Sequence, residues 1–163
     1  MIRLIAAIDR RRGIAKNGAM PWHIPEDEAY FTRQTKTHGA AVLTGGTTFR
    51  DTYKNRPLAD RQNYVLTHRD TPIPGAVVVH DLDALLREFT EKDLWVSGGA
   101  EIFAQVIAAG KADELYLTRI DAEFGCDKFF PEYEDAFTLA EESEVHEQNG
   151  FHFTYARYIP RGR

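Results

Sequence analysis

Apolar residues recur along the chain in short runs of strand length, and several of the segments between these runs have helical spacing. Many of the runs are continuous rather than alternating, which is typical of strands buried on both faces of a largely parallel sheet. The strand candidates are Leu4–Ile8, Ala40–Leu43, Tyr64–Leu66, Ala76–Val79, Leu94–Val96 and Leu115–Leu117. The helix candidates are Glu26–Lys36, Thr48–Tyr53, Leu82–Phe89 and Ala100–Ala109. This alternation predicts an α/β sheet with helices on both faces.

The pattern changes after Ala112, where no strong helix candidate follows. Two extended segments, Phe137–Val145 and Phe151–Ile159, flank Asn149-Gly150, a dipeptide that strongly favours a hairpin turn. We therefore predict a single domain over residues 1–163. Its α/β fold should have a mixed, mostly parallel central sheet, flanking helices and an antiparallel C-terminal hairpin.

Composition places the chain among ordinary globular proteins. Its 163 residues are 43% hydrophobic, and a chain of this length buries most of its apolar surface without disulfides. The single cysteine, Cys126, cannot form an internal disulfide. No apolar run approaches the roughly 18 residues of a membrane span, and Met1–Ile8 is too short, and too soon followed by charge, for a signal peptide. These features predict a soluble cytoplasmic protein with no membrane partner.

Charge is distributed unevenly along the chain, although the total is only −5. Residues 1–69 hold 12 basic and 6 acidic residues, a balance of +6, whereas residues 70–163 hold 8 and 19, a balance of −11. The acidic total argues against a nucleic-acid partner, which would normally meet a dominant basic face. The basic N-terminal part is compatible with a small anionic ligand.

Glycine pairs mark two junctions between a strand candidate and a helix candidate. Gly45-Gly46 precedes the helix candidate at Thr48, and Gly98-Gly99 precedes the one at Ala100. At such a junction the helix N-terminus presents free N–H groups, and glycine allows a phosphate to approach the backbone. A tight turn would explain one such pair, but two at equivalent places favour a ligand site at this edge of the sheet.

A nucleotide would have to be held without the common phosphate-binding motifs. Gly13 and Gly18 have P-loop spacing, but Ala19-Met20 follows in place of Lys-Ser/Thr. The sequence also contains no Gly-x-Gly-x-x-Gly, which excludes a standard Rossmann site. The segment from Asp9 to Ile24 has little periodicity and is long enough to form a lid.

The most specific stretch of the sequence surrounds Asp27. Pro25 suits the first position of the helix that follows. The helix dipole favours carboxylates in the first turn, and this explains the neighbours Glu26 and Glu28 sufficiently. Asp27 also shares a helical face with Phe31, so partial desolvation would raise its pKa towards a range that is useful for proton transfer.

Together with its neighbours, this stretch resembles the signature region of the dihydrofolate reductase family. The matching motifs occur in the family's order and cover nearly the whole chain. They are Gly13-Ile14-Ala15-x-x-Gly18, Met20-Pro21-Trp22-x-x-Pro25-x-Asp27, Gly45 with Thr48, Arg56-Pro57-Leu58, Arg61-Gln62-Asn63, Val96-x-Gly98-Gly99-x-x-Ile102-Phe103, Leu115-Tyr116-Leu117-Thr118-Arg119-Ile120-Asp121 and Asp127-x-x-Phe130-Pro131. The resemblance implies an enzyme that transfers a hydride from NADPH to the pterin ring of 7,8-dihydrofolate, supplying tetrahydrofolate for one-carbon metabolism.

The resemblance assigns a substrate role to one set of residues. Asp27 would hydrogen-bond the pterin and favour its protonation, while Thr118 braces the carboxylate and Trp22 helps to hold an ordered water. Met20 would belong to a loop that closes to exclude water. Arg61 would bind the glutamate α-carboxylate of the substrate as a bidentate pair, which lysine could not copy. The residues lining the pterin and benzoyl rings would be Ile5, Ala6, Ala7, Phe31 and Leu58.

A second set of residues would contact NADPH. The nicotinamide and its ribose would meet the lid, and the pyrophosphate would meet the two glycine junctions. The peptide bond between Gly98 and Gly99 would be cis. The implied cofactor residues are Ala7, Ile14, Asn17, Gly18, Ala19, Gly45, Gly46, Thr47, Thr48, Thr67, His68, Arg69, Ser97, Gly98, Gly99, Ala100, Glu101, Ile102 and Phe103.

Three positions depart from the family's common pattern. Gly46 stands where many relatives carry a basic residue that binds the 2′-phosphate of the cofactor. Glu101 stands where a basic or neutral residue is usual, and Ser97 occupies an often aliphatic position. Binding of the 2′-phosphate would then depend on residues 67–69. We expect NADPH to be preferred, with weaker discrimination against NADH than is usual.

Two other functions share part of this pattern. The related pyrimidine reductase of riboflavin synthesis also uses NADPH, but it would need neither Asp27 after Pro-Trp nor Arg61 for a glutamate tail. A non-catalytic folate- or nucleotide-binding relative would not need Asp27, Thr118, Trp22 and Arg61 together. The six histidines are scattered, so no metal site is predicted. We expect a monomer whose ligands are dihydrofolate and NADPH.

Overall fold

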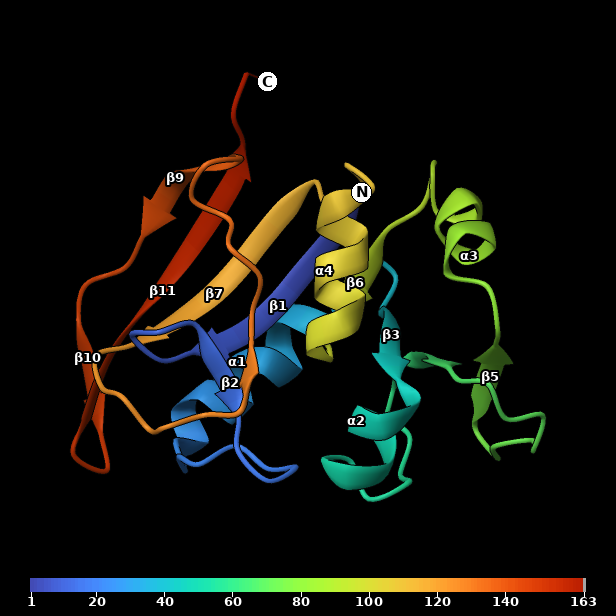
Figure 1. Ribbon diagram of the computed structural model, residues 1–163, viewed down its shortest axis with the longest axis horizontal. Coiled ribbons are helices and arrows are strands. Elements are labelled where there is room, and N and C mark those ends of the chain that lie inside the picture. Colours follow the sequence, from blue (N-terminus) through green and yellow to red (C-terminus); the bar gives the residue numbers. More distant parts are fainter. Residues whose placement is uncertain (163) are drawn as a thin grey trace.

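The central sheet of the computed structural model is mostly parallel, as the continuous apolar runs predict (Figure 1). The structure describes residues 1–162, and nine of their strands join this sheet in the order β10-β11-β7-β1-β6-β3-β4-β5, with β9 paired to β11. All pairings from β7 to β5 are parallel. The parallel strands are β1 (Ile2–Ile8), β3 (Ala41–Gly45), β4 (Gln62–Leu66), β5 (Ala76–Val79), β6 (Leu94–Val96) and β7 (Glu114–Ile120).

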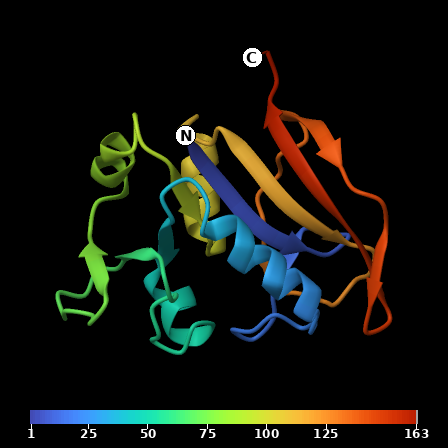
Figure 2. The same cartoon turned by 180° about the vertical axis from the view of Figure 1, so that it is seen from behind.

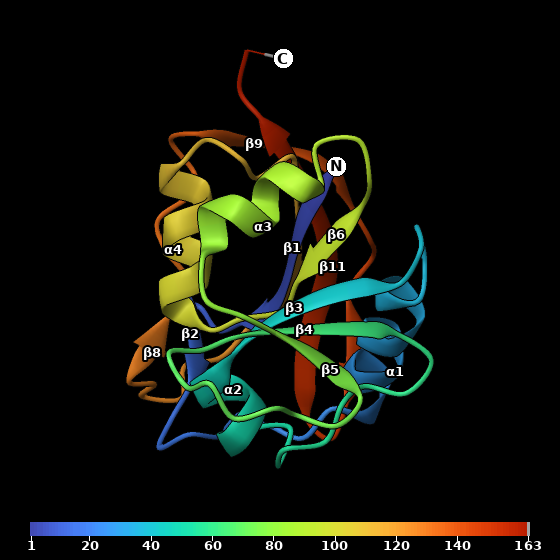
Figure 3. The same ribbon diagram turned by 90° about the vertical axis from the view of Figure 1, so that its right-hand side faces the viewer.

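Helices cover both faces of this sheet, in agreement with the prediction. Helix α4 (Ala100–Ala108) lies in front of the sheet in Figure 1, and α1 (Pro25–Thr35) lies in front of it in the reverse view of Figure 2. Figure 3 shows α3 (Leu82–Glu88) on the same side as α4. The central strands are therefore apolar on both faces, and Leu4, Leu43 and Leu115 are fully buried.

Helix α2 (Gly46–Asp51) begins and ends two residues earlier than predicted. Gly45, the last residue of β3, is its N-cap in an extended conformation, so the helix starts without a connecting loop. The predicted end at Tyr53 is wrong because the Thr52 and Tyr53 amides both donate to the Thr48 carbonyl. The chain then turns through two residues with positive φ, Lys54 and Asn55.

The C-terminal hairpin forms at Asn149-Gly150, where both residues have positive φ as a type I′ turn requires. The strand within the predicted extended segment Phe137–Val145 ends at Glu142, and two separate strands pair with β11 (Phe151–Pro160). These strands are β9 (Phe137–Glu142) and β10 (His146–Gln148). Between them the Ser143 amide donates to the Tyr155 carbonyl at 2.9 Å, but the Tyr155 amide donates to the Ser143 hydroxyl at 2.9 Å.

The segment from residue 9 to residue 24, here called the lid segment, is more ordered than its sequence predicts. It contains the short strand β2 (Gly13–Ala15), which pairs antiparallel with β8 (Lys128–Phe129). Strand β8 belongs to residues 121–130, here called the opposing loop, which follows β7. The described part of the chain contains no helix that is long and apolar enough to cross a membrane.

Candidate functional site

The two glycine junctions lie against each other at the carboxyl ends of β3 and β6. The Gly45 amide donates to the Gly98 carbonyl at 2.8 Å. A Cβ on Gly45 would lie 2.9 Å from Ile102 Cδ1, and a Cβ on Gly99 would lie 2.8 Å from Thr48 Oγ1, so neither position has room for a side chain. The Gly98–Gly99 peptide bond is cis, as the resemblance implies. The free first-turn amides of α4 therefore lie close to the Thr48 hydroxyl.

Asp27 is partly buried in the first turn of α1, opposite the middle of β7. The Thr118 hydroxyl donates to Asp27 Oδ1 at 2.5 Å, and Thr118 itself is buried. Burial raises the pKa of Asp27 to about 6, with smaller contributions in the same direction from Glu28 and Glu26. The Thr118 hydrogen bond opposes this shift because it favours the carboxylate. Asp27 can therefore both bind a cationic or N–H-bearing ring and take part in proton transfer near neutral pH.

The apolar residues assigned to the substrate lie on two sides of this acid. Ile5 is buried in β1, and Phe31 and Leu58 pack partly exposed against the same cluster. Trp22 is buried with Ile24, and Ala7 packs against them. Phe31 lies one helical turn after Asp27 on α1, so a ring bound at the carboxylate would also be near an apolar side chain.

Arg61 is oriented by two hydrogen bonds that the sequence alone does not indicate. Its Nη1 donates to Thr35 Oγ1 at 2.8 Å, and its Nε donates to the Ala59 carbonyl at 2.9 Å. Thr35 is completely buried near the end of α1, and it donates in turn to the Phe31 carbonyl. Neither contact of Arg61 uses Nη2. The guanidinium is therefore held in place with one amino group left for a carboxylate.

Asn63 supports the same turn, a role that its sequence position does not reveal. Its side-chain oxygen accepts from the Leu58 amide at 2.8 Å, and its amide group donates to the carbonyls of Leu58 and Arg61. Asn63 is buried at the start of β4. Because it bonds both ends of the turn, it fixes the position of Leu58 relative to Arg61.

Most of the lid residues assigned to the cofactor lie on the surface. Asn17 and Gly18 have positive φ in a turn closed by hydrogen bonds between Lys16 and Ala19. The side chain of Met20 is 44% exposed. Ile14, in contrast, packs against the central core cluster that includes Ile102 and Phe103, so the near end of the lid is attached to the body of the protein.

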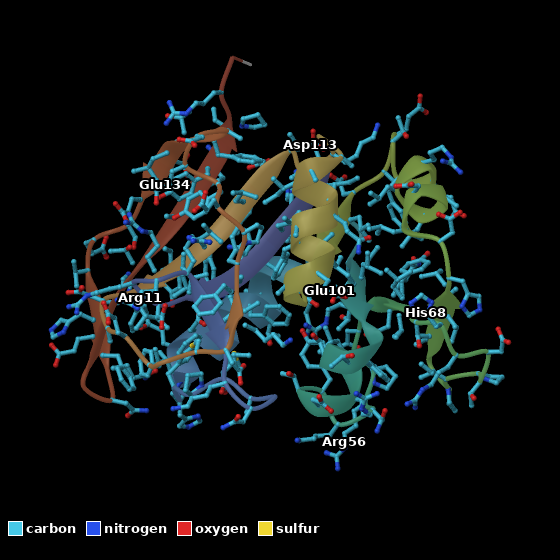
Figure 4. All side chains as sticks on the ribbon, viewed as in Figure 1. Arg11, Arg56, His68, Glu101, Asp113 and Glu134 are labelled. Carbon is cyan, nitrogen blue, oxygen red and sulfur yellow. The ribbon has the colours of Figure 1, made fainter. Side chains whose placement is uncertain are left out.

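The residues assigned to the 2′-phosphate form a weakly charged surface beyond α2. A Cβ on Gly46 would lie 3.1 Å from Thr67 Cβ, so Gly46 and Thr67 are adjacent. His68 and Arg69 are exposed, and in Figure 4 His68 lies on the β5 side of α2, while Glu101 lies at the end of α4 next to α2. Thr47 and Ala100 lie in the first turns of α2 and α4.

Three residues that contact assigned cofactor residues were not identified from the sequence, namely His80, Thr44 and Tyr53. His80 Nδ1 lies 2.7 Å from the Thr67 carbonyl oxygen, and His80 follows β5 directly. Ser97 Oγ lies 2.9 Å from Thr44 Oγ1 and accepts from the Tyr53 hydroxyl at 3.1 Å. No periodicity marks Tyr53 or Thr44 as site residues, since they meet Ser97 only through tertiary folding.

The structure thus brings the two assigned sets of residues together at one edge of the sheet. Asp27, Thr118 and most of the apolar lining residues come from α1, β7 and β1, and Leu58 comes from the turn before β4. The glycine junctions lie where β3 and β6 meet the helices that follow them. Thr67, which lies next to Gly46, and the exposed residues His68 and Arg69 follow β4. Residues 1–162 contain no cluster of His, Cys, Asp and Glu side chains that could hold a metal ion.

Comparisons with known proteins agree on one family. The family model described as "Dihydrofolate reductase" matches residues 1–160. The chain is 33% identical to the dihydrofolate reductase of Bacillus subtilis, over 97% of this chain and 94% of the relative. It is 32% identical to that of Drosophila melanogaster, over 93% of each. Among solved structures it is similar to the dihydrofolate reductase from Enterococcus faecalis complexed with NADP(H) and RAB-propyl, with a TM-score of 0.87, 28% identity and coverage of 99% and 96%.

Proposed function

This chain belongs to the dihydrofolate reductase family, and from this premise we propose which of its side chains carry the reaction. It is an NADPH-dependent oxidoreductase that reduces 7,8-dihydrofolate to 5,6,7,8-tetrahydrofolate. NADPH, when bound, supplies the hydride. The protein's own contribution is to align the two rings, to exclude water and to control one proton. The observation that carries the assignment is the partly buried Asp27, braced by Thr118 and bordered by apolar side chains.

Asp27 acts as the group that binds the polar edge of the pterin and favours its protonation. Its pKa of about 6 keeps a fraction of the carboxyl protonated near neutral pH, so a proton is available close to the reacting nitrogen. Thr118 fixes the orientation of the carboxylate through its 2.5 Å hydrogen bond. Trp22, buried beside Ala7 and followed by the α1 residues, would hold an ordered water near this edge.

The apolar residues position the substrate rather than react with it. Ile5, Ala6, Ala7 and Phe31 line the pterin, and Leu58 packs against the benzoyl ring. Arg61 binds the glutamate α-carboxylate, with its guanidinium already oriented by Thr35. Because the arginine is fixed before the substrate arrives, little of its side-chain entropy is lost on binding.

The residues present fit NADPH at its pyrophosphate. Free amides at the start of α4 and the Thr48 hydroxyl are donors suited to an anion, and glycine at positions 45, 98 and 99 leaves the backbone uncovered. Gly45, Gly99, Ala100, Ile102 and Phe103 would hold this part of the cofactor. Ala7, Ser97 and the lid residues Ile14, Asn17, Gly18, Ala19 and Met20 would enclose the nicotinamide and exclude water.

At the 2′-phosphate the fit is weaker, since Gly46 supplies no positive charge and Glu101 supplies a negative charge, which repels a phosphate. Thr67, His68 and Arg69 would make the contacts, and Arg69 would provide the positive charge. We therefore propose that NADPH is preferred over NADH by a smaller factor than in relatives with a basic residue at position 46. Steady-state kinetics with both cofactors test this; equal kcat/KM values, or a preference for NADH, would refute it.

Loss of NADPH absorbance that depends on added dihydrofolate tests the proposed activity directly. A protein that binds both ligands without turnover would be the non-catalytic relative, and reduction of a ribosylated pyrimidine instead of dihydrofolate would identify the riboflavin-pathway reductase. We further propose that the protein is cytoplasmic. We also propose that it is a monomer, because all of the assigned residues come from one chain. Sedimentation equilibrium at assay concentration checks the monomeric state.

A further inference from the structure

Asp9 is a buried carboxylate that bonds to both loops beside the nicotinamide site. It directly follows β1, and only 4% of its surface is exposed. Its Oδ1 accepts from the amides of Arg11 at 2.9 Å and Gly13 at 2.7 Å, both in the lid segment. Its Oδ2 accepts from the Phe124 amide at 3.2 Å and lies 3.6 Å from the Cys126 thiol, both in the opposing loop. One side chain therefore joins two segments separated by more than a hundred residues.

The residues around this carboxylate are tightly packed and leave no room for a side chain at Gly13. Gly13 is buried, and a Cβ there would lie 2.6 Å from Cys126 Cβ and Sγ and 2.8 Å from Asp9 Oδ2. Since Gly13 does not have a positive φ, it is the lack of space that requires glycine. Burial and the neighbouring Asp9 raise the pKa of the Cys126 thiol to about 11, so the thiol remains a protonated donor towards the carboxylate.

Further contacts extend this connection along the lid. The Arg10 amide donates to the Ala122 carbonyl at 2.9 Å, and the Phe130 amide donates to the Arg12 carbonyl at 2.7 Å. Beyond them, β2 pairs with β8. These backbone contacts join the same two segments as Asp9 does, and they lie further along the lid segment from its side chain.

We propose that Asp9 is a positioning residue for hydride transfer, because it sets where the lid segment lies relative to the nicotinamide. This rests on the proposed function, in which residues 14–20 enclose the nicotinamide. Asp9 is attached to the end of β1, the strand that also carries Ile5 and Ala7 of the pterin pocket. The carboxylate thereby gives the lid and the pterin pocket a common fixed point. It contacts neither ligand, so its effect is transmitted through Gly13 and Ile14.

The Asp9→Asn variant tests this role because it keeps one oxygen acceptor and replaces the other by an N–H donor. That donor would face the Phe124 N–H and the Cys126 thiol, so the two segments separate on one side. We expect the single-turnover hydride-transfer rate at saturating ligands to fall by roughly 10- to 100-fold, since displacement by about 1 Å has effects of this size. NADPH should dissociate faster, while the Kd of dihydrofolate should change less than about twofold, because Asp27 and Arg61 are not moved.

A matched control removes another carboxylate from the same junction. Asp121 lies in the opposing loop and pairs with Arg10 of the lid segment at 2.7 Å, but both side chains are more than half exposed. Asp121→Asn should leave hydride transfer within about twofold of the wild-type rate, as exposed pairs contribute little.

A second pair of variants decides the question if Asp9→Asn does not fold. Gly13→Ala should slow hydride transfer because its methyl group displaces Cys126 and Asp9. Adding Cys126→Gly removes two of the three close contacts and should restore part of the hydride-transfer rate. If the two substitutions acted only by lowering stability, their effects would add and the double variant would be slower than Gly13→Ala.

Three outcomes separate the proposals. A wild-type protein that shows no dihydrofolate-dependent oxidation of NADPH overturns the proposed function and this inference with it. An active wild type with unchanged hydride transfer in Asp9→Asn overturns the inference alone. If Asp9→Asn is unfolded, wild-type hydride transfer in Gly13→Ala, or no recovery in the double variant, also overturns it.

Discussion

The substrate end and the cofactor-phosphate end of the site are built differently. At the substrate end each charged group has a buried hydroxyl partner: Asp27 bonds Thr118, and Arg61 bonds Thr35. At the phosphate end the side chains of His68, Arg69 and Glu101 are all exposed. One end is thus fixed by the protein interior, and the other is open to solvent and partly repulsive towards an anion.

This difference indicates which ligand the protein orients most strictly. A hydride moves only when the two rings are aligned. In the proposed site, the pterin would be aligned by groups that are fixed before it binds. In the same proposal the phosphate end of the cofactor would contribute affinity, for which exposed charges are sufficient. The absence of a basic residue at position 46 should therefore alter the preference for NADPH over NADH more than it alters the rate of hydride transfer.

The largest effect should follow from changing the acid at the substrate end. Asp27→Asn keeps the shape of the side chain and removes the ionisable group, so turnover at neutral pH should fall by about 10²–10⁴-fold. If the lost function is proton supply, the variant should regain rate as the pH falls, because substrate protonated in solution then replaces the missing proton. The measurement is the pH dependence of single-turnover hydride transfer. A variant that is fully active at neutral pH would refute the role of Asp27.

The second largest effect should come from Arg61→Lys, which tests whether Arg61 binds the substrate through its planar geometry as well as its charge. Arg61→Lys retains the charge but loses the planar group that binds Thr35 and a carboxylate together. Loss of a charged hydrogen bond costs about 1.5–3 kcal/mol, so the Kd of dihydrofolate should rise by about 10- to 100-fold. A pterin substrate without the glutamate is the control, and its binding should not change. An equal loss with both substrates would show that Arg61 acts only on stability.

The sequence predicted the parts of this site that depend on local chain geometry. Both glycine junctions and Asp27 in the first turn of a helix follow from residues adjacent in sequence. It did not predict the partner of Arg61, since Thr35 lies 26 residues away and near the end of a different element. The part that Asp9 takes in joining the lid segment to the opposing loop was missed for the same reason, because Asp9 and Phe124 meet only after the sheet forms. The fold class was predictable, and the family resemblance supplied Thr118 as the partner of Asp27. Neither the local sequence nor the resemblance indicated Thr35 as the partner of Arg61.

A smaller effect concerns stability at the substrate end. Because the pKa of Asp27 in the folded protein is raised to about 6, ionisation destabilises the folded state as the pH rises from about 4 to about 6. An asparagine side chain does not ionise, so the Tm of Asp27→Asn minus that of wild type should increase over this range and stay constant above it. For a protein of this size, about 1 kcal/mol corresponds to a change in Tm of roughly 2–4 °C. A difference in Tm that does not vary with pH would show that Asp27 is not desolvated.

The smallest effect should come from the phosphate end, where Glu101 is exposed on α4 near Gly99. Glu101→Gln removes a negative charge and Glu101→Arg replaces it by a positive one, so the ratio of kcat/KM for NADPH to that for NADH should rise in this order. Exposed charge interactions are worth about 0.2–1 kcal/mol, which limits each step to a factor of about five or less. NADH is the internal control because it lacks the 2′-phosphate, and added salt should reduce the gain. If both cofactors gain equally, Glu101 acts on the pyrophosphate that they share, and the weak 2′-phosphate binding must be explained by Gly46 alone.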